Sequence, residues 1–485
     1  MIARGARTGE DADDLYVEEA LALVNAPHHG RRPGHGGTPP GPGAASPGPG
    51  AASPGPGGPA GPASSGTGRG GPGAAWSGTG EDTAPHRATP WHRARDLASR
   101  AARTAARRAA APVPLEAALG LVLAEPLDAL TDLPSFDTSA MDGWAVSGPG
   151  PWDVRESGAL AGGALPEPLT DGEAAPIATG ARLPQETTAV LRTEHGRTDP
   201  QGRLHATREM GHGQDIRPRA QECRSGDQLL PAGVLVTPAV LGLAAAAGYD
   251  ALTVVPRPRV DVLVLGDELL AAGLPREGRI RDALGPMLPS WLRALGAQTG
   301  AVRRIGDDAK ALHQAVTRSQ ADLIVTTGGT AAGPVDHVQP VLRRIGAELL
   351  VHGVAVRPGH PMLLARVGEG RHLVGLPGNP LAAVSGLITL AEPLLRALSA
   401  RPSPEPYALP LREAVRGHPH DTRLVPVALR GDHAVPLRYQ GPAMLRGIAA
   451  ADALAVVPPS GAGVGQETEL LDLPWAAAGI GVCFT

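Results

Sequence analysis

Two short apolar stretches decide the fold that this sequence predicts: VDVLVLG at residues 260–266 and ADLIVTTGG at residues 321–329. Each is an apolar run that ends in glycine, and a short apolar run is typical of a buried strand. HLVGL at residues 372–376 predicts a third strand of this kind. Strands that alternate with helices predict a doubly wound α/β domain over residues 258–400, with its ligand site at the carboxyl ends of the strands. Helices are expected near residues 283–296, 308–319, 336–345 and 380–398, and one further strand near residues 300–304.

The regions on either side of this domain have other compositions. Residues 140–212 mix short β-like runs with turns and predict a small β-rich domain, and residues 401–485 predict a small C-terminal β-barrel or sandwich. Residues 26–86 are dominated by Gly, Pro, Ala and Ser, and they bury too little apolar surface to offset the entropy of ordering. We therefore expect a multidomain α+β and α/β protein with a disordered tail over residues 1–86.

Residues 91–111 consist largely of Ala, Arg and Leu, which are good helix formers. Leu97 and the alanines predict an apolar stripe beneath a solvated, arginine-rich face. The alternative is a basic helix that binds nucleic acid or a membrane.

The composition excludes several classes of protein. The formal net charge is −4, so the chain has no overall excess of basic residues to neutralise the phosphates of a long nucleic acid. Cys223 and Cys483 are the only cysteines, too few for a disulfide framework, which fits a reducing compartment. The N-terminal stretch has acidic residues where a signal peptide is apolar, and the run at residues 239–248 is too short for a membrane helix. We expect a cytoplasmic protein that binds neither nucleic acid nor membrane.

Carboxylates follow two of the predicted strands. Asp267 and Glu268 lie in LGDELL after the first strand, and Asp307 and Asp308 follow the strand near residues 300–304. Like charges that converge on one rim of a sheet repel each other unless a cation shares them, and hard divalent ions prefer oxygen ligands. The convergence predicts a Mg²⁺ site, while helix capping is the better interpretation for any single acid.

The segment TTGGTAAGPVD at residues 326–336 follows a strand directly. Gly328 and Gly329 allow backbone amides to approach a phosphate or a pterin ring, although a plain tight turn has the same pattern. Asp336 begins the next helix, where capping also favours a carboxylate.

Two proline-rich bends and one long loop provide the remaining candidates. RPGHP at residues 357–361 is predicted to present Arg357 and His360 to an anionic ligand. The alternative is that RPGHP and LPGNP, at residues 376–380, are simple turns. SFDTSAMDGWAV at residues 135–146 has little helical or strand period, and loops so rich in specific side chains are more often sites than spacers.

These motifs, in this order, resemble those of the MoeA family of molybdopterin molybdenumtransferases, which includes the E domain of gephyrin. LPSFDTSAMDGWAV at residues 133–146 resembles the hallmark segment of the family, and GEAAPIATGARLP at residues 172–184 its second motif. LGDEL, TTGGTAAGPVD, RPGHP and LPGNP are similar to the motifs of its molybdopterin-binding domain.

The resemblance implies an enzyme that takes adenylylated molybdopterin and molybdate, uses Mg²⁺, releases AMP and leaves molybdenum on the dithiolene sulfurs. A MogA-like molybdopterin adenylyltransferase is then the upstream partner. The resemblance further implies a homodimer, in which the hallmark segment of one subunit meets the α/β domain of the other. Residues 87–139 and 213–257 would together form the N-terminal linker and dimerisation domain.

The resemblance also assigns roles to individual positions. The implied catalytic residues are Asp142, Glu268, Asp307 and Asp336; the cofactor-binding residues are Thr179, Gly328, Gly329, Arg357, His360, Pro377 and Asn379; the metal ligands are Asp142, Glu222, Asp267 and Glu268. The sequence departs from the family pattern at Leu265, Ala283, Leu284 and Ala331, where the family has hydroxyl or amide side chains. A catalytically weakened paralogue that binds molybdopterin or acts as a scaffold is therefore the alternative function.

Overall fold

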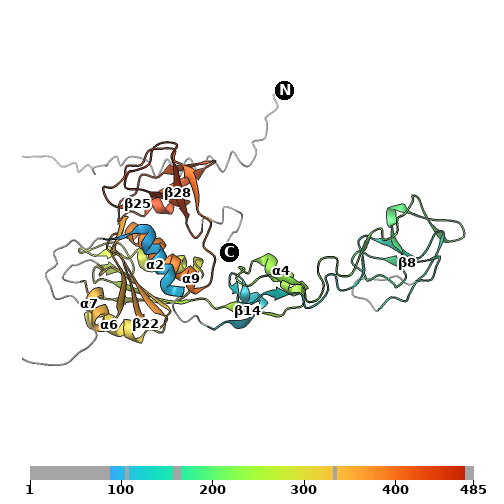
Figure 1. Ribbon diagram of the computed structural model, residues 1–485, viewed down its shortest axis with the longest axis horizontal. Coiled ribbons are helices and arrows are strands. Elements are labelled where there is room, and N and C mark those ends of the chain that lie inside the picture. The colour runs from blue at the N-terminus through green and yellow to red at the C-terminus, as the bar shows by residue number, and fades with distance from the viewer. Residues whose placement is uncertain (1–87, 104–108, 157–164, 331–335, 476–485) are drawn as a thin grey trace, which may run out of the picture. The chain divides into compact units, whose positions relative to one another are not determined.

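The computed structural model describes residues 88–103, 109–156, 165–330 and 336–475 (Figure 1). The predicted disordered tail over residues 1–86 and the departure at Ala331 lie outside the described residues.

A six-stranded sheet forms the centre of the α/β domain, with the strand order β18-β15-β19-β23-β22-β20. The first four strands are parallel, and β22 and β20 are antiparallel to their neighbours. The strands are β15 (Arg259–Leu265), β18 (Gln298–Ile305), β19 (Leu323–Thr327), β20 (Glu348–His352), β22 (Leu363–Gly368) and β23 (Arg371–Leu376). The parallel strands were predicted, whereas the antiparallel pair that extends the sheet was not.

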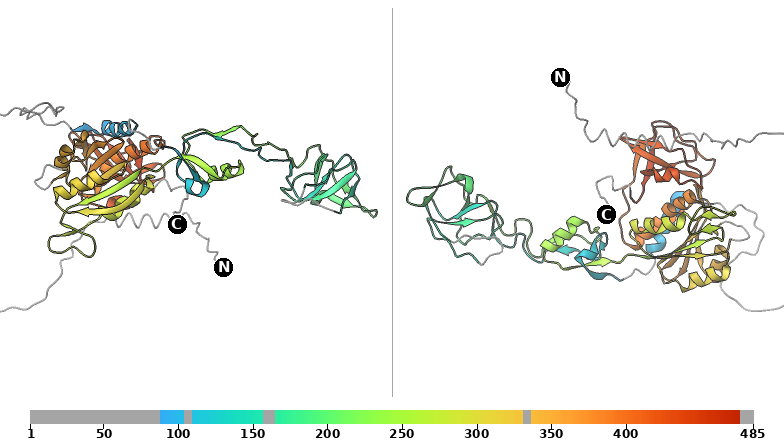
Figure 2. Two further views of the ribbon diagram at one scale, coloured as in Figure 1. Left: turned by 90° about the horizontal axis from the view of Figure 1, so that it is seen from below. Right: turned by 180° about the vertical axis from the view of Figure 1, so that it is seen from behind.

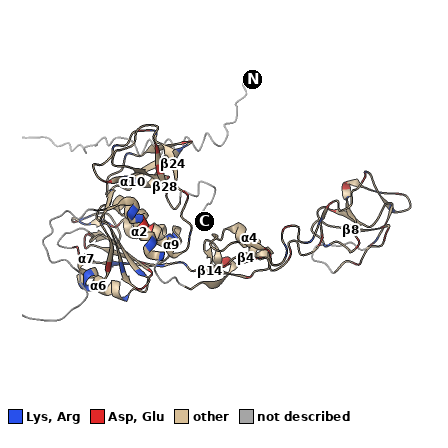
Figure 3. Cartoon of the chain, in the orientation of Figure 1, with Lys and Arg blue, Asp and Glu red and all other residues tan. Residues whose placement is uncertain are grey.

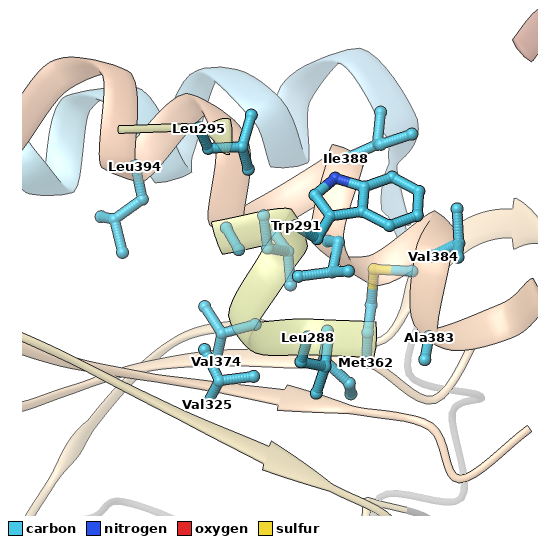
Figure 4. Close-up of a cluster of buried hydrophobic side chains, with 14 of the residues drawn as sticks. Leu288, Trp291, Leu295, Val325, Met362, Val374, Ala383, Val384, Ile388 and Leu394 are labelled. Atoms are coloured by element: carbon cyan, nitrogen blue, oxygen red, sulfur yellow. The ribbon is translucent and has the colours of Figure 1, made fainter. Parts of the chain in front are cut away.

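Helices cover both faces of this sheet, which confirms the doubly wound architecture. On one face, α6 (Ala309–Arg318) and α7 (Val338–Arg344) pack against Leu263, Ile324 and Leu373. The other face carries the neighbouring strand residues, because successive side chains in a strand point in opposite directions. There α5 (Leu284–Ala294), α8 (Pro380–Gly386), η2 (Leu387–Ala391) and α9 (Glu392–Leu398) enclose the larger core, and Figure 4 shows Leu288 and Trp291 of α5 above Val325 and Val374.

Helix α2 (Trp91–Arg103) packs along α9 and η2, as the views of Figures 1 and 2 agree. Its buried face consists of Trp91 and four alanines at helical spacing, Ala94, Ala98, Ala101 and Ala102. The basic residues of the helix are blue in Figure 3: Arg93, Arg100 and Arg103 are exposed, whereas Arg95 is half-buried and donates to Ile388 O. The indole Nε1 of Trp91 donates a hydrogen bond of 3.0 Å to the buried Thr389 Oγ1. The helix falls within residues 87–139, which we assigned to the linker domain, but its buried side chains belong to the core of the α/β domain.

The segment Pro380–Leu398 is apolar and long enough, at 19 residues, to cross a membrane. However, 83% of its most apolar window is buried in the fold. This burial is typical of a core helix, and the segment forms the centre of the larger hydrophobic cluster.

Residues on both sides of the β-rich domain pair with each other. Three small sheets join them: β2 (Ala111–Pro114), β14 (Ala251–Val255) and β3 (Val122–Leu123); β4 (Leu127–Asp128) and β13 (Gln228–Leu230); β5 (Thr138–Ser139) and β12 (Ile216–Arg217). Helices α3 (Leu115–Ala118) and α4 (Pro238–Ala246) contribute to the same small core. The β-rich domain itself is one six-stranded sheet in the order β10 (Gly196–Thr198), β11 (Arg203–Ala206), β7 (Trp152–Val154), β8 (Glu173–Ile177), β6 (Gly143–Val146) and β9 (Ala189–Arg192).

The C-terminal domain is a small β-barrel, as predicted. Its strands are β24 (Tyr407–Pro410), β25 (Thr422–Arg430), β26 (His433–Pro436), β27 (Ala453–Val457) and β28 (Glu467–Asp472). A bridge between Leu411 and Ala434, with a 2.9 Å hydrogen bond from Arg412 N to Ala434 O, joins the β24 end of the sheet to β26 and closes it. Strand β21 (Val354–Arg357) leaves the α/β domain and pairs with β25, and β1 (Thr89–Pro90) pairs with β21.

Candidate functional site

A pocket of about 130 Å³ opens where β15, β18 and β19 end. This is the carboxyl edge of the parallel sheet, where a doubly wound fold binds its ligand. The pocket is lined by Leu265, Gly266, Glu268, Gly306, Asp307, Asp308, Leu312, Gly328, Gly329, Asp336 and His337.

The double-glycine turn needs glycine at both positions. Gly328 and Gly329 have φ angles of +78° and +66°, in the left-handed region that residues with a Cβ rarely adopt. A Cβ on Gly329 would also lie 3.0 Å from Cγ2 of Val338, the first residue of α7. The N–H of Gly328 donates to Leu376 O at 2.9 Å, which joins the turn to the end of β23. The backbone of the turn therefore forms one wall of the pocket.

The acids at this edge divide into two kinds. The carboxylate of Asp308 accepts hydrogen bonds from Lys310 N and Ala311 N at 2.7 and 3.1 Å, so it caps α6, and the capping interpretation holds for this residue. Glu268, Asp307 and Asp336 line the same pocket, and the cap position of α7 is occupied by His337 rather than by Asp336.

Within the described residues, no three or more His, Cys, Asp or Glu side chains are grouped so that they could hold a metal ion by themselves. Mg²⁺ is commonly bound by one or two carboxylates together with substrate phosphates and water, rather than by an all-protein cage. The carboxylates that line the pocket provide oxygen ligands of the kind that such an ion takes. Asp267 is an exposed neighbour of this edge; a Cβ on Gly306 would lie 2.2 Å from its Oδ1.

Asp142 and Thr179 contact each other in the β-rich domain. Asp142 precedes β6 and Thr179 follows β8, and the pairing of these strands brings the two residues together. Thr179 donates to Asp142 Oδ1 through its backbone N–H at 2.7 Å and its hydroxyl at 2.9 Å. These hydrogen bonds lower the pKa of the Asp142 carboxyl and keep it ionised. Neither residue lines the carboxyl-edge pocket.

Glu222 lies in a third place, an open pocket of about 710 Å³ between the linker strands and α4. It is exposed there, and Arg217 lines the same pocket. The four predicted metal ligands, Asp142, Glu222, Asp267 and Glu268, are therefore not gathered into one site in the described part of a single chain.

The RPGHP bend contacts the C-terminal barrel. Arg357 ends β21, and its Nε donates to Asp421 Oδ2 at 2.8 Å. His360 Nδ1 lies 2.9 Å from Val354 O, and because a carbonyl oxygen only accepts, Nδ1 carries the proton. Sequence reasoning missed Asp421, because no pattern around residue 421 signals that it meets a bend more than sixty residues earlier.

The LPGNP bend also receives a contact from the barrel. Asn379 is the cap residue of α8 but makes no side-chain capping bond; instead, Leu381 N and Ala382 N donate to Pro442 O at 2.9 and 3.2 Å. A Cβ on Gly378 would lie 3.7 Å from Gly328 Cα, so the bend that contains Pro377 and Asn379 lies against the double-glycine turn.

An ion pair between the buried Asp282 and the exposed Arg304 lies beside two of the departures from the family pattern. Asp282 is 3% exposed and accepts from Arg304 at 2.7 Å and from Gly285 N at 2.8 Å. Ala283, at the cap position of α5, makes no side-chain capping bond, and Leu284 is buried in the core. Asp282 thus supplies a side-chain acceptor to an amide at the start of α5.

Comparisons with known proteins agree with this organisation. Family models described as "MoeA N-terminal region (domain I and II)", "Probable molybdopterin binding domain" and "MoeA C-terminal region (domain IV)" match residues 89–248, 261–397 and 408–473. Molybdopterin molybdenumtransferase 2 of Mycobacterium tuberculosis is 35% identical over 381 residues, which cover 74% of this chain and 93% of that protein. The chain belongs to the MoeA family.

Other MoeA-family relatives are consistent with this assignment. Molybdopterin molybdenumtransferase of Staphylococcus aureus is 30% identical over 296 residues, 59% of this chain and 70% of that protein. A crystal structure of a MoeA protein from Pyrococcus horikoshii has a TM-score of 0.66 at 26% identity and covers 80% of this chain and 99% of that chain. Among these MoeA relatives, the curated names favour the enzyme over the weakened paralogue.

Proposed function

We propose that this member of the MoeA family is a molybdopterin molybdenumtransferase of molybdenum-cofactor biosynthesis, which inserts molybdate into adenylylated molybdopterin with release of AMP. The observation that carries the proposal is the carboxyl-edge pocket, where a double-glycine turn faces three carboxylates. Because the N–H of Gly328 already donates to Leu376 O, the Gly329 amide is the one of this pair that would meet the phosphates of an adenylylated substrate. The names of the curated relatives support the same reaction.

The proposed metal is Mg²⁺, with Glu268 and Asp307 as its ligands and Asp267 next to them. When bound, the ion would offset the charge of the substrate phosphates. Asp336, which lines the same pocket two residues before α7, is the proposed catalytic acid. Arg357 presents a permanent positive charge to an oxyanion, and His360 presents Nε2.

A homodimer would complete the site. Asp142 and Thr179 are not among the residues that line the pocket, so we propose that a second copy of the chain supplies them, with Glu222 from the linker. Since a twofold dimer makes the same contact twice, each dimer would hold two such sites. We further propose a cytoplasmic location, and a MogA-like adenylyltransferase as the source of the substrate.

The direct test is AMP release from adenylylated molybdopterin by the purified protein with Mg²⁺, with and without molybdate. We expect molybdate to stimulate release, and Asp336→Asn and Asp142→Asn to abolish it without lowering the melting temperature. Asp308→Asn is the matched control, because it removes a charge from the same rim while asparagine keeps the cap of α6. Binding without AMP release in the wild-type protein would contradict the proposal.

Mixing inactive variants tests the shared site. In a random mixture of Asp142→Asn and Asp336→Asn subunits, half of the dimers are mixed and each mixed dimer has one intact site, so about a quarter of the wild-type rate should return. If both residues act within one subunit, the mixture stays inactive.

A further inference from the structure

The ion pair between Arg357 and Asp421 joins the RPGHP bend to the C-terminal barrel. Arg357 is the last residue of β21, and Asp421 immediately precedes β25, the barrel strand with which β21 pairs. The Asp421 side chain is 10% exposed, whereas that of Arg357 is 50% exposed. The carboxylate is thus a buried anchor for a guanidinium that faces solvent.

The geometry of this pair leaves part of the guanidinium available. Asp421 Oδ2 accepts from Nε at 2.8 Å, and the Arg357 side chain makes no other hydrogen bond to a described residue. The terminal nitrogens of an arginine held through Nε keep their planar fork, which matches an oxyanion in bidentate fashion. A side chain fixed in this way also loses less conformational entropy when it binds.

Contacts connect this arginine to the carboxyl-edge pocket. A Cβ on Gly359, in the RPGHP bend, would lie 3.0 Å from Ala382 O of α8, so the bend packs on that helix. The LPGNP bend, which immediately precedes α8, lies against the double-glycine turn through Gly378 and Gly328. The carbonyl oxygen of Pro442, in the barrel, accepts hydrogen bonds from the first amides of α8.

We propose that Asp421, a residue of the C-terminal barrel, is a positioning residue for the proposed reaction: it orients Arg357 so that the terminal nitrogens bind an oxyanion of the substrate. The inference rests on the proposed function. It assigns to the barrel a part in substrate binding, which acts through Arg357 rather than by direct contact.

The test is the KM and kcat of AMP release for Asp421→Ala and for the isosteric Asp421→Asn. We expect Asp421→Ala to raise the KM for adenylylated molybdopterin about tenfold with kcat within about twofold of wild type, and Asp421→Asn to raise KM less, since its amide oxygen still accepts from Nε. Asp452→Asn is the control, because this barrel carboxylate accepts from Leu429 N at 2.8 Å and is remote in sequence from the RPGHP contact.

A second comparison separates positioning from general stability. In the Arg357→Ala background, Asp421→Asn should not raise KM further, because the residue through which it acts is gone. Two results would overturn the inference: an unchanged KM in both Asp421 variants, or an additive increase in the double variant. If the wild-type protein releases no AMP, the proposed function fails first, and the inference fails with it.

Discussion

Replacing Gly329 by alanine tests whether the double-glycine turn presents its backbone to the ligand. At φ +66°, a residue with a Cβ costs about 1 kcal/mol relative to glycine. The new Cβ would also lie 3.0 Å from Val338 Cγ2, and Val338 is 1% exposed, so the turn or the start of α7 must shift by a few tenths of an ångström. If the shift breaks one charge-assisted hydrogen bond to phosphate, worth about 1.5–3 kcal/mol, KM rises about 10- to 150-fold.

Gly346→Ala is the control for this variant. Gly346 follows the C-terminus of α7 with φ +69°, and a Cβ there meets no atom within 4 Å, so the backbone strain is the same without the collision. Urea unfolding measures the cost in stability, and AMP release measures KM. We expect Gly346→Ala to lose about 1 kcal/mol of stability and to keep the wild-type KM. An equal KM for the two variants would refute the idea that the turn contacts the ligand.

Three further predictions concern stability and ionisation. Trp91→Phe should lower the free energy of unfolding by about 1–3 kcal/mol in urea, because it leaves the buried Thr389 hydroxyl without its partner; an unchanged midpoint would contradict this. Burial lowers the pKa of His372 to about 4, so as the pH decreases the unfolded chain binds this proton before the folded protein does. The free energy of unfolding should therefore fall by about 3 kcal/mol between about pH 6.5 and pH 4. Urea unfolding of His372→Leu over the same pH range should lack this decrease. Thr179→Val removes one of the two donors to Asp142 and should move the carboxyl pKa in an NMR titration up toward its ordinary value, and no movement would show that the backbone donor suffices.

The parallel strands could be predicted because strands buried on both faces are apolar almost throughout, as β19 is. The antiparallel strands β20 and β22 carry charged residues at Glu348 and Arg366, which interrupt the apolar pattern, and a salt bridge joins these two residues across the strands. An edge pair of this kind has no distinctive period and was not predicted.

The site could be predicted only in part, for reasons that concern particular residues. Asp307 and Asp308 are adjacent and identical in type, but only the backbone conformation of Asp308 places its carboxylate over the first amides of α6. The contact of Asp142 with Thr179 depends on the register of β6 and β8, and the contact of Arg357 with Asp421 on the pairing of β21 with β25. Such long-range pairings come from the packed fold and leave no local trace in the sequence.

Helix α2 has a consequence for how the chain is made. It enters the core of the α/β domain through Trp91 and its alanines, yet its partner α9 ends at Leu398, almost three hundred residues later. At ribosomal rates of about 5–20 residues per second, about 15–60 s pass between the synthesis of α2 and the completion of α9. Until then the apolar face of α2 lacks the helix against which it packs. During that interval the linker and β-rich domains, whose strands lie between the two helices in the sequence, are free to fold first. The α/β domain closes after them, around the first helix to leave the ribosome among the described residues, and the strands of the C-terminal barrel, from Tyr407 onward, follow it.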